Sequence, residues 1–104
     1  MYGLHGKMTA QPGQRDALLD IMLSGTDTSN PMPGCYLYLI SRATDDPDGI
    51  WITEIWRSKE DHDASLTLDA VKALIAVARP LIAGGSDRSE FTPLGGLGLP
   101  VEGG

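Results

Sequence analysis

The hydrophobic periodicity of this chain changes repeatedly between about two residues and about 3.6 residues, and this change most limits how the chain can fold. Apolar and polar side chains alternate over residues 2–9, which predicts a strand with one mixed face. Over residues 14–24 the apolar residues recur at the three- and four-residue spacing of a helix, and Gly25 follows as a helix stop. The chain therefore begins with a strand followed by a helix.

Two more strands follow. Residues 35–42 and 50–57 are rich in β-branched and aromatic side chains, and the segment between them, residues 44–49, contains Asp, Pro and Gly. This pattern predicts an antiparallel hairpin.

A second helical region begins after the hairpin. Ser58 and Asp61 have the spacing of a capping box. Asp69 can start a second segment, because apolar residues recur with helical spacing from Val71 to Ala78. A weaker, more polar strand is expected over residues 86–92.

The resulting order, β-α-β-β-α-β, favours an α+β ferredoxin-like fold: a four-stranded antiparallel sheet with two helices on one face. The length of 104 residues fits one domain, which we place at residues 1–93. Residues 94–104 form a Gly- and Leu-rich tail, and we expect its leucines to dock on the domain or on a partner subunit.

The sheet face away from the helices is expected to carry a mixture of aromatic, aliphatic and polar side chains. Its expected members are His5, Lys7, Tyr36, Tyr38, Ile40, Ile50, Ile52, Glu54 and Trp56. Leu37, Leu39 and the core residue Trp51 would lie on the other face, towards the helices. A face this apolar predicts a homodimer formed through the sheet, with a cavity for a small aromatic molecule between the two sheets.

Composition excludes several classes of partner. The net charge of -6 and the pI of about 4.6 repel phosphate backbones, so no nucleic acid partner is expected. The longest apolar stretches, residues 17–23 and 73–78, fall short of the roughly 20 residues of a membrane span. The single cysteine, Cys35, and the absence of a visible signal peptide favour a cytoplasmic protein.

No cofactor or metal motif is present in the sequence. Residues 95–98 are glycine-rich but do not open a helix, so they are not a dinucleotide loop. The acidic turn at residues 45–48 lacks the spacing of a calcium loop, and two histidines and one cysteine are too scattered for a transition-metal site. We therefore expect neither a cofactor nor a metal.

Three short motifs give the chain a family resemblance. They are a Pro-Gly pair before the first helix (residues 9–14), Pro33-Gly34-Cys35 before a Tyr-bearing strand, and the segment Ile-Thr-Glu-Ile-Trp-Arg-Ser at residues 52–58. With these motifs the chain resembles the antibiotic biosynthesis monooxygenase domain family, which includes quinol monooxygenases. The resemblance covers residues 1–93.

The resemblance implies a dimeric α+β barrel in which dioxygen oxidises a phenolic or quinol substrate without flavin, haem or metal. Trp56 matches the family tryptophan at the end of the third strand. Many members carry a histidine at the position of Ser65, so that histidine's role is not transferred to His62. Haem-degrading relatives use a histidine further along this helix, which is absent here, so haem chemistry is disfavoured.

Cofactor-free oxygenation needs a base that turns the substrate into an electron-rich anion, with donors to stabilise it in a dry pocket. His5 is the expected base because imidazole exchanges protons near neutral pH, and Trp56 is the second expected catalytic residue. Tyr36, Tyr38, Lys7 and Glu54 are the expected substrate-binding residues. His62 lies among acidic residues and is expected at the surface.

Two other functions fit the same pattern. The chain could be a non-catalytic dimeric barrel that binds or senses a small molecule, or a decarboxylase or isomerase that uses the same proton abstraction. The fold alone does not choose between them.

Overall fold

The computed structural model describes residues 1–26 and 32–99, apart from the side chains of residues 86 and 87. The elements are β1 (Tyr2–Ala10), α1 (Arg15–Ser24), β2 (Cys35–Arg42), β3 (Gly49–Trp56), α2 (Lys59–Ser65), α3 (Asp69–Ala78), the 3₁₀ helix η1 (Arg79–Leu81) and β4 (Ile82–Phe91). This is the predicted order, with the second helical region divided into α2 and α3.

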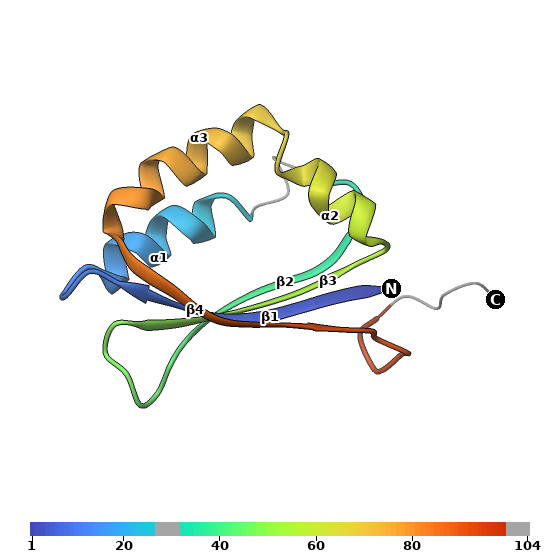
Figure 1. Ribbon diagram of the computed structural model, residues 1–104, viewed down its shortest axis with the longest axis horizontal. Coiled ribbons are helices and arrows are strands. Elements are labelled where there is room, and N and C mark those ends of the chain that lie inside the picture. The colour runs from blue at the N-terminus through green and yellow to red at the C-terminus, as the bar shows by residue number, and fades with distance from the viewer. Residues whose placement is uncertain (27–31, 100–104) are drawn as a thin grey trace.

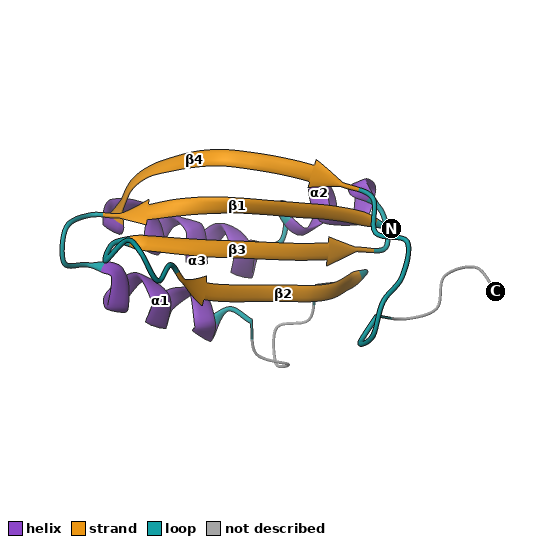
Figure 2. Ribbon diagram, turned by 90° about the horizontal axis from the view of Figure 1, so that it is seen from below, coloured by secondary structure: helices purple, strands orange, loops and turns teal. Residues whose placement is uncertain are grey.

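The four strands form one sheet in the order β2-β3-β1-β4, and every neighbouring pair is antiparallel. All helices cover the same face (Figure 1), and the opposite face carries no helix (Figure 2). The ferredoxin-like α+β prediction is therefore confirmed.

Local contacts fix α2 against the end of the sheet. The backbone N–H of Asp61 donates to Ser58 Oγ at 3.1 Å, which confirms the predicted cap. The hydrogen bond from the Arg57 guanidinium, 2.7 Å from the Asp61 carboxylate, lowers the pKa of Asp61. Gly34 has a φ of 81°, and a Cβ there would overlap Asp61, so the turn before β2 requires glycine. These contacts fix where α2 presents its inner face.

Strand β4 begins at Ile82, four residues earlier than predicted. Gly84 and Gly85 are unfavourable in strands, yet they pair with Thr9 and Met8 of β1. The pairing satisfies the backbone groups of β4, and tertiary structure overrides the local preference.

The core lies between the sheet and the helices. Leu18 of α1 and Ile50 of β3 have no exposed surface and anchor one end, where they pack with Leu19, Met22, Ala10 and Ala78. Trp56, with 1% of its surface exposed, is the largest fully buried side chain. None of the helices in the described part of the chain is long and apolar enough to cross a membrane.

The prediction of which sheet face meets the helices was wrong for β2 and β3. Tyr38 is registered with Glu54, and Glu54 with Leu4, so these side chains share one face. That face is the one beneath the helices, because its residues border the same space as residues of α1 and α3. Trp56 and the isoleucines at positions 40, 50 and 52 lie there too. Alternation shows which residues share a face but does not show which face the helices cover.

The uncovered face carries residues that were expected in the core. Leu39 and His5 both pair with Thr53, and His5 stacks on Trp51, so these side chains lie together away from the helices. Leu39 is 49% exposed. Leu37 lies on this face as well, because it pairs with Ile55. The uncovered face is therefore apolar, although not through the predicted residues.

The first two leucines of the tail do not pack on the domain. Leu94 is 93% exposed and Leu97 is fully exposed. The last five residues of the tail, 100–104, lie outside the described residues.

Candidate active site

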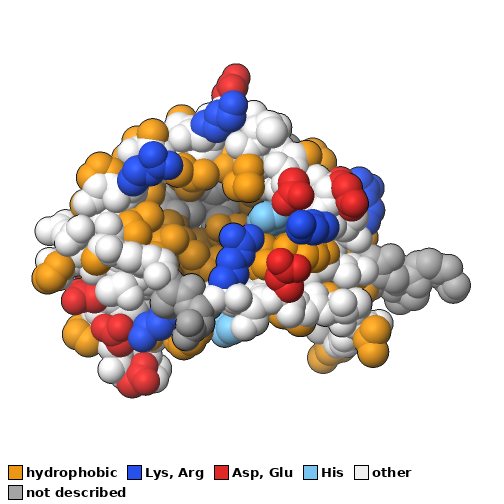
Figure 3. Space-filling view, in the orientation of Figure 1, with side chains coloured by type: hydrophobic (Ala, Val, Ile, Leu, Met, Phe, Trp, Pro, Cys, Tyr) orange, Lys and Arg blue, Asp and Glu red, His pale blue; other side chains and the backbone are white. Residues whose placement is uncertain are grey.

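A cavity of about 970 Å³ lies between the sheet and the helices. Figure 3 shows it as a hollow lined mainly by hydrophobic side chains, with Lys and Arg side chains near its mouth. Some of its lining residues, such as Gly6, Gly85 and Ala73, have little or no side chain, so they leave space between the sheet and the helices. One end is apolar and is bordered by Leu18, Ile21, Met22, Leu74 and Ile75.

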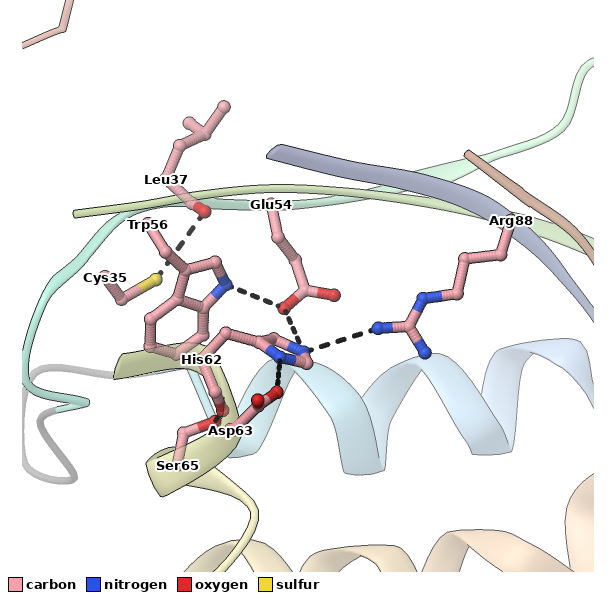
Figure 4. A network of polar contacts seen from close by, with 8 residues as sticks. All are labelled: Cys35, Leu37, Glu54, Trp56, His62, Asp63, Ser65 and Arg88. Carbon is pink, nitrogen blue, oxygen red and sulfur yellow. Dashed lines mark hydrogen bonds and ion pairs between the residues drawn. The ribbon is translucent and has the colours of Figure 1, made fainter. Parts of the chain in front are cut away.

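Polar side chains gather at the other end of the cavity. Trp56 Nε1 donates a hydrogen bond to Glu54 Oε1 at 3.0 Å, and His62 Nε2 lies 4.0 Å from the same oxygen. Arg88 Nη2, from the edge strand β4, lies 3.5 Å from His62 Nε2. Figure 4 shows these groups converging beneath the sheet from β3, α2 and β4. Tyr38 of β2 borders the same space.

His62 is buried, with 7% of its surface exposed, so the expectation of a surface histidine was wrong. Its Nδ1 lies 3.0 Å from Asp63 Oδ1, and its ring meets the Trp56 ring edge-on at 5.5 Å. An ionised carboxylate only accepts hydrogen bonds, so Nδ1 carries a hydrogen and donates a hydrogen bond to Asp63. The ring burial follows from α2, which turns His62 and Ser65 towards the sheet.

The geometry leaves His62 Nε2 as a group that can accept a proton inside the cavity. A guanidinium has donors and no acceptor, so the nitrogen that faces Arg88 presents its lone pair. An imidazole with its far nitrogen fixed by a carboxylate is the arrangement of a general base.

Two other ionisable groups near the cluster keep their protons at neutral pH. Burial, followed by the charge of Glu54, raises the pKa of Tyr38 well above its usual value, so its phenol is a hydrogen-bond donor. Burial and Glu54 also raise the pKa of Cys35 to about 11, while its Sγ–H donates to the Leu37 carbonyl at 3.5 Å. Because the thiolate is the nucleophile, Cys35 is inert at neutral pH.

The structure divides the expected site residues between the two faces of the sheet. Tyr38, Glu54 and Trp56 meet in the cavity. His5 is exposed on the other face, where it stacks on Trp51 at 4.9 Å and shares a hydrogen bond of 2.8 Å with Thr53.

The remaining two expected residues also lie apart from the cluster. Lys7 borders the cavity, but its ammonium nitrogen lies 3.0 Å from Asp46 and 5.9 Å from the Trp51 ring centre. Tyr36 lies at an irregularity of β2, where the register shifts between Cys35 and Leu37. It is half-buried and is not among the residues that border the cavity.

Sequence reasoning missed His62 and Arg88. The available signal for His62 was its three-residue spacing to Ser65, which puts both on one helical face. That signal is weak, because this helical face is polar and the acidic neighbours of His62 indicate a solvent-exposed position. Arg88 had no signal, since its contact with His62 joins positions 26 apart in the chain.

Within residues 1–26 and 32–99, no three His, Cys, Asp or Glu side chains are grouped so that they could hold a metal ion.

The sequence and the fold match a known class of protein. The family model of the antibiotic biosynthesis monooxygenases matches residues 1–77, so the chain belongs to that family. None of the curated proteins matches it.

A solved structure from Chloroflexus aurantiacus J-10-fl that carries the same family name is similar over nearly the whole chain. It is 50% identical with a TM-score of 0.87, over 95% of this chain and 98% of that one. A structure from Caulobacter crescentus is 19% identical with a TM-score of 0.80, and the match covers 90% of each chain. One from Deinococcus radiodurans is 21% identical with a TM-score of 0.76, over 99% of this chain and 100% of that one. The last two establish similarity of fold alone.

Proposed function

We propose that this protein is a cofactor-independent monooxygenase that oxidises a quinol-like or polycyclic phenolic molecule with dioxygen. The observation that carries the proposal is the placement of His62 Nε2, a proton acceptor, between Glu54 and Arg88 at the polar end of a large apolar cavity. Membership in the monooxygenase family supports the type of reaction. In this proposal His62 replaces His5 as the base.

The chemistry follows from proton removal. The substrate hydroxyl transfers its proton to His62 Nε2, and the phenolate becomes electron-rich enough to give an electron to dioxygen. A carbon–oxygen bond then forms at a ring carbon, and the resulting peroxide anion takes the proton back from His62. The hydroperoxide then loses one molecule of water to leave a quinone. One oxygen atom of dioxygen enters the product and the other leaves as water.

The other cavity residues have supporting roles in this proposal. Trp56 has 1% of its surface exposed, holds Glu54 through its Nε1–H and packs edge-on with the His62 ring, so its role in this proposal is to position these two side chains. The protonated Tyr38 can donate a hydrogen bond to the developing anion. The volume of about 970 Å³ lies at the upper end of the range for sites of drug-sized ligands, which suits several fused rings or a long substituent.

The test is an oxygen-electrode assay of chelator-treated protein with a panel of quinols, naphthols and anthrone-like compounds. We expect one dioxygen consumed for each product molecule, at a rate well above autoxidation in buffer. His5→Ala should retain the full rate, because His5 lies on the other side of the sheet. Ligand binding without oxygen uptake would instead support a small-molecule binding protein. That alternative is also favoured by Ser65, which occupies the position where many family members carry a histidine.

We also propose that the protein is a homodimer formed through the uncovered sheet face. Leu39, Trp51 and Phe91 give that face an apolar surface, and Phe91 packs over Gly3. Large exposed apolar patches on small domains mark contact surfaces. A partner subunit would also cover the exposed leucines at positions 94 and 97.

Leu39→Glu should convert the dimer to a monomer, because it places a charge within the proposed apolar contact. The molar mass from light scattering during size-exclusion chromatography measures this. Leu23→Glu is the matched control, since Leu23 is similarly exposed, at 53%, but lies on α1. A wild-type protein that is monomeric at micromolar concentration would contradict the proposed interface.

A further inference from the structure

Arg88 lies at the polar end of the cavity, where a ligand would contact it. It comes from the edge strand β4, is exposed to solvent, and extends its guanidinium to 3.5 Å from His62 Nε2. Figure 4 shows its side chain reaching across from the strand towards the imidazole. A contact of 3.5 Å is at the weak limit for a hydrogen bond, so it can be exchanged for a better one.

Protonation of His62 would change this contact. Once Nε2 holds a proton, it has no lone pair to offer, and a positive imidazole faces a positive guanidinium. The two groups would then repel each other, and Arg88 would lose its partner on His62 at the step in which a substrate oxygen becomes negative.

We propose that Arg88 binds the phenolate oxygen of the ligand, transferring its hydrogen bond from His62 Nε2 to the substrate as the proton moves the other way. The phenol O–H bond breaks, the proton forms a bond to His62 Nε2, and the Arg88 N–H that faced Nε2 then donates to the oxyanion. This inference rests on the proposed function, because it assumes a phenolic ligand in the same cavity. A hydrogen bond from a guanidinium to an oxyanion is charge-assisted and therefore stronger than one between neutral groups.

The charges around His62 favour the exchange. The groups that face it are Tyr2 from β1, Glu54 from β3, Asp63 from its own helix and Arg88 from β4, and Tyr38 from β2 borders the same cavity. Asp63 and Glu54 are negative and stabilise the imidazolium once it forms, whereas both would repel a phenolate. Among these five groups, only Arg88 carries a positive charge that attracts the new anion.

The test uses a nitronaphthol whose phenolate absorbs visible light and which is too electron-poor to react with dioxygen. Absorbance against pH gives the pKa of the bound and the free naphthol. In wild-type protein at low ionic strength, we expect the bound pKa to lie about 1–3 units below the free value, because a cation lies within contact distance of the oxygen. Arg88→Gln should remove most of this shift, and Arg88→Lys should restore part of it.

The methyl ether of the same naphthol separates charge recognition from a structural role. It has the same shape but cannot ionise, so Arg88→Gln should leave its affinity unchanged. Equal losses of affinity for the naphthol and its ether would overturn the inference, as would an unshifted bound pKa or a wild-type protein that does not bind the naphthol. The assay does not depend on oxygen turnover. Phenolate capture without oxygen uptake would contradict only the proposed function, and oxygen uptake without a shift that depends on Arg88 would contradict only this inference.

Discussion

His62→Gln is expected to reduce the rate of oxygen uptake by about 10²- to 10⁴-fold, the usual contribution of a positioned general base. Glutamine is similar in size and polarity, so it can fill the space between Glu54 and Trp56, but it does not accept a proton at neutral pH. The oxygen electrode measures the effect under saturating substrate, where only the chemical step and product release limit the rate.

The result has two controls. His5→Gln makes the same chemical change on the uncovered face and should leave the rate unaltered. Affinity of the His62 variant for the naphthol methyl ether should stay at the wild-type value, which shows that the cavity is intact. Full activity in the His62 variant would contradict the assignment of this residue as the base.

Trp56→Ala is expected to destabilise the fold by about 3–5 kcal/mol, the range for removing a large buried aromatic side chain. Trp56 has 1% of its surface exposed and packs against the His62 ring, and its Nε1–H satisfies the Glu54 carboxylate. The substitution leaves both an empty volume and a half-buried carboxylate without its donor. Since a domain of this kind has about 5–15 kcal/mol in total, a large fraction of its stability would be lost.

The chain offers its own control for this prediction. Trp51 lies five residues earlier on the same strand but on the uncovered face, where it is half-exposed. Trp51→Ala should therefore cost less. Urea unfolding followed by circular dichroism measures both variants, and the Leu39→Glu background removes any contribution from subunit contacts. Equal losses from the two tryptophans would contradict the burial described for Trp56.

Local signals in the sequence predicted the fold well. The order of elements follows from the change in hydrophobic period, and the capping residue of α2 follows from Ser58 and Asp61. The start of β4 was missed because two glycines hide a strand that only its pairing with β1 stabilises. Such pairing joins distant parts of the chain, and a local pattern contains no information about it.

The candidate site was predicted in part. Tyr38, Glu54 and Trp56 were correctly grouped on one face, because alternation along paired strands fixes their relation. They were combined with His5 and Lys7 of β1, which belong to the opposite face, because no sequence signal aligned β1 with β3. His62 and Arg88 reach the cluster only through the packing of α2 and β4 against the sheet.

Gly85 has a consequence for how this protein could diverge. It borders the cavity, its φ is not in the left-handed region, and a Cβ built on it meets no atom within 4 Å. A larger residue at this position would project into empty space without straining the strand. The size of molecule that is admitted could thus be altered by mutation at one site, with the proton-transfer groups left untouched. A substitution at Gly85 could therefore change which ligand binds without lowering the stability of the fold.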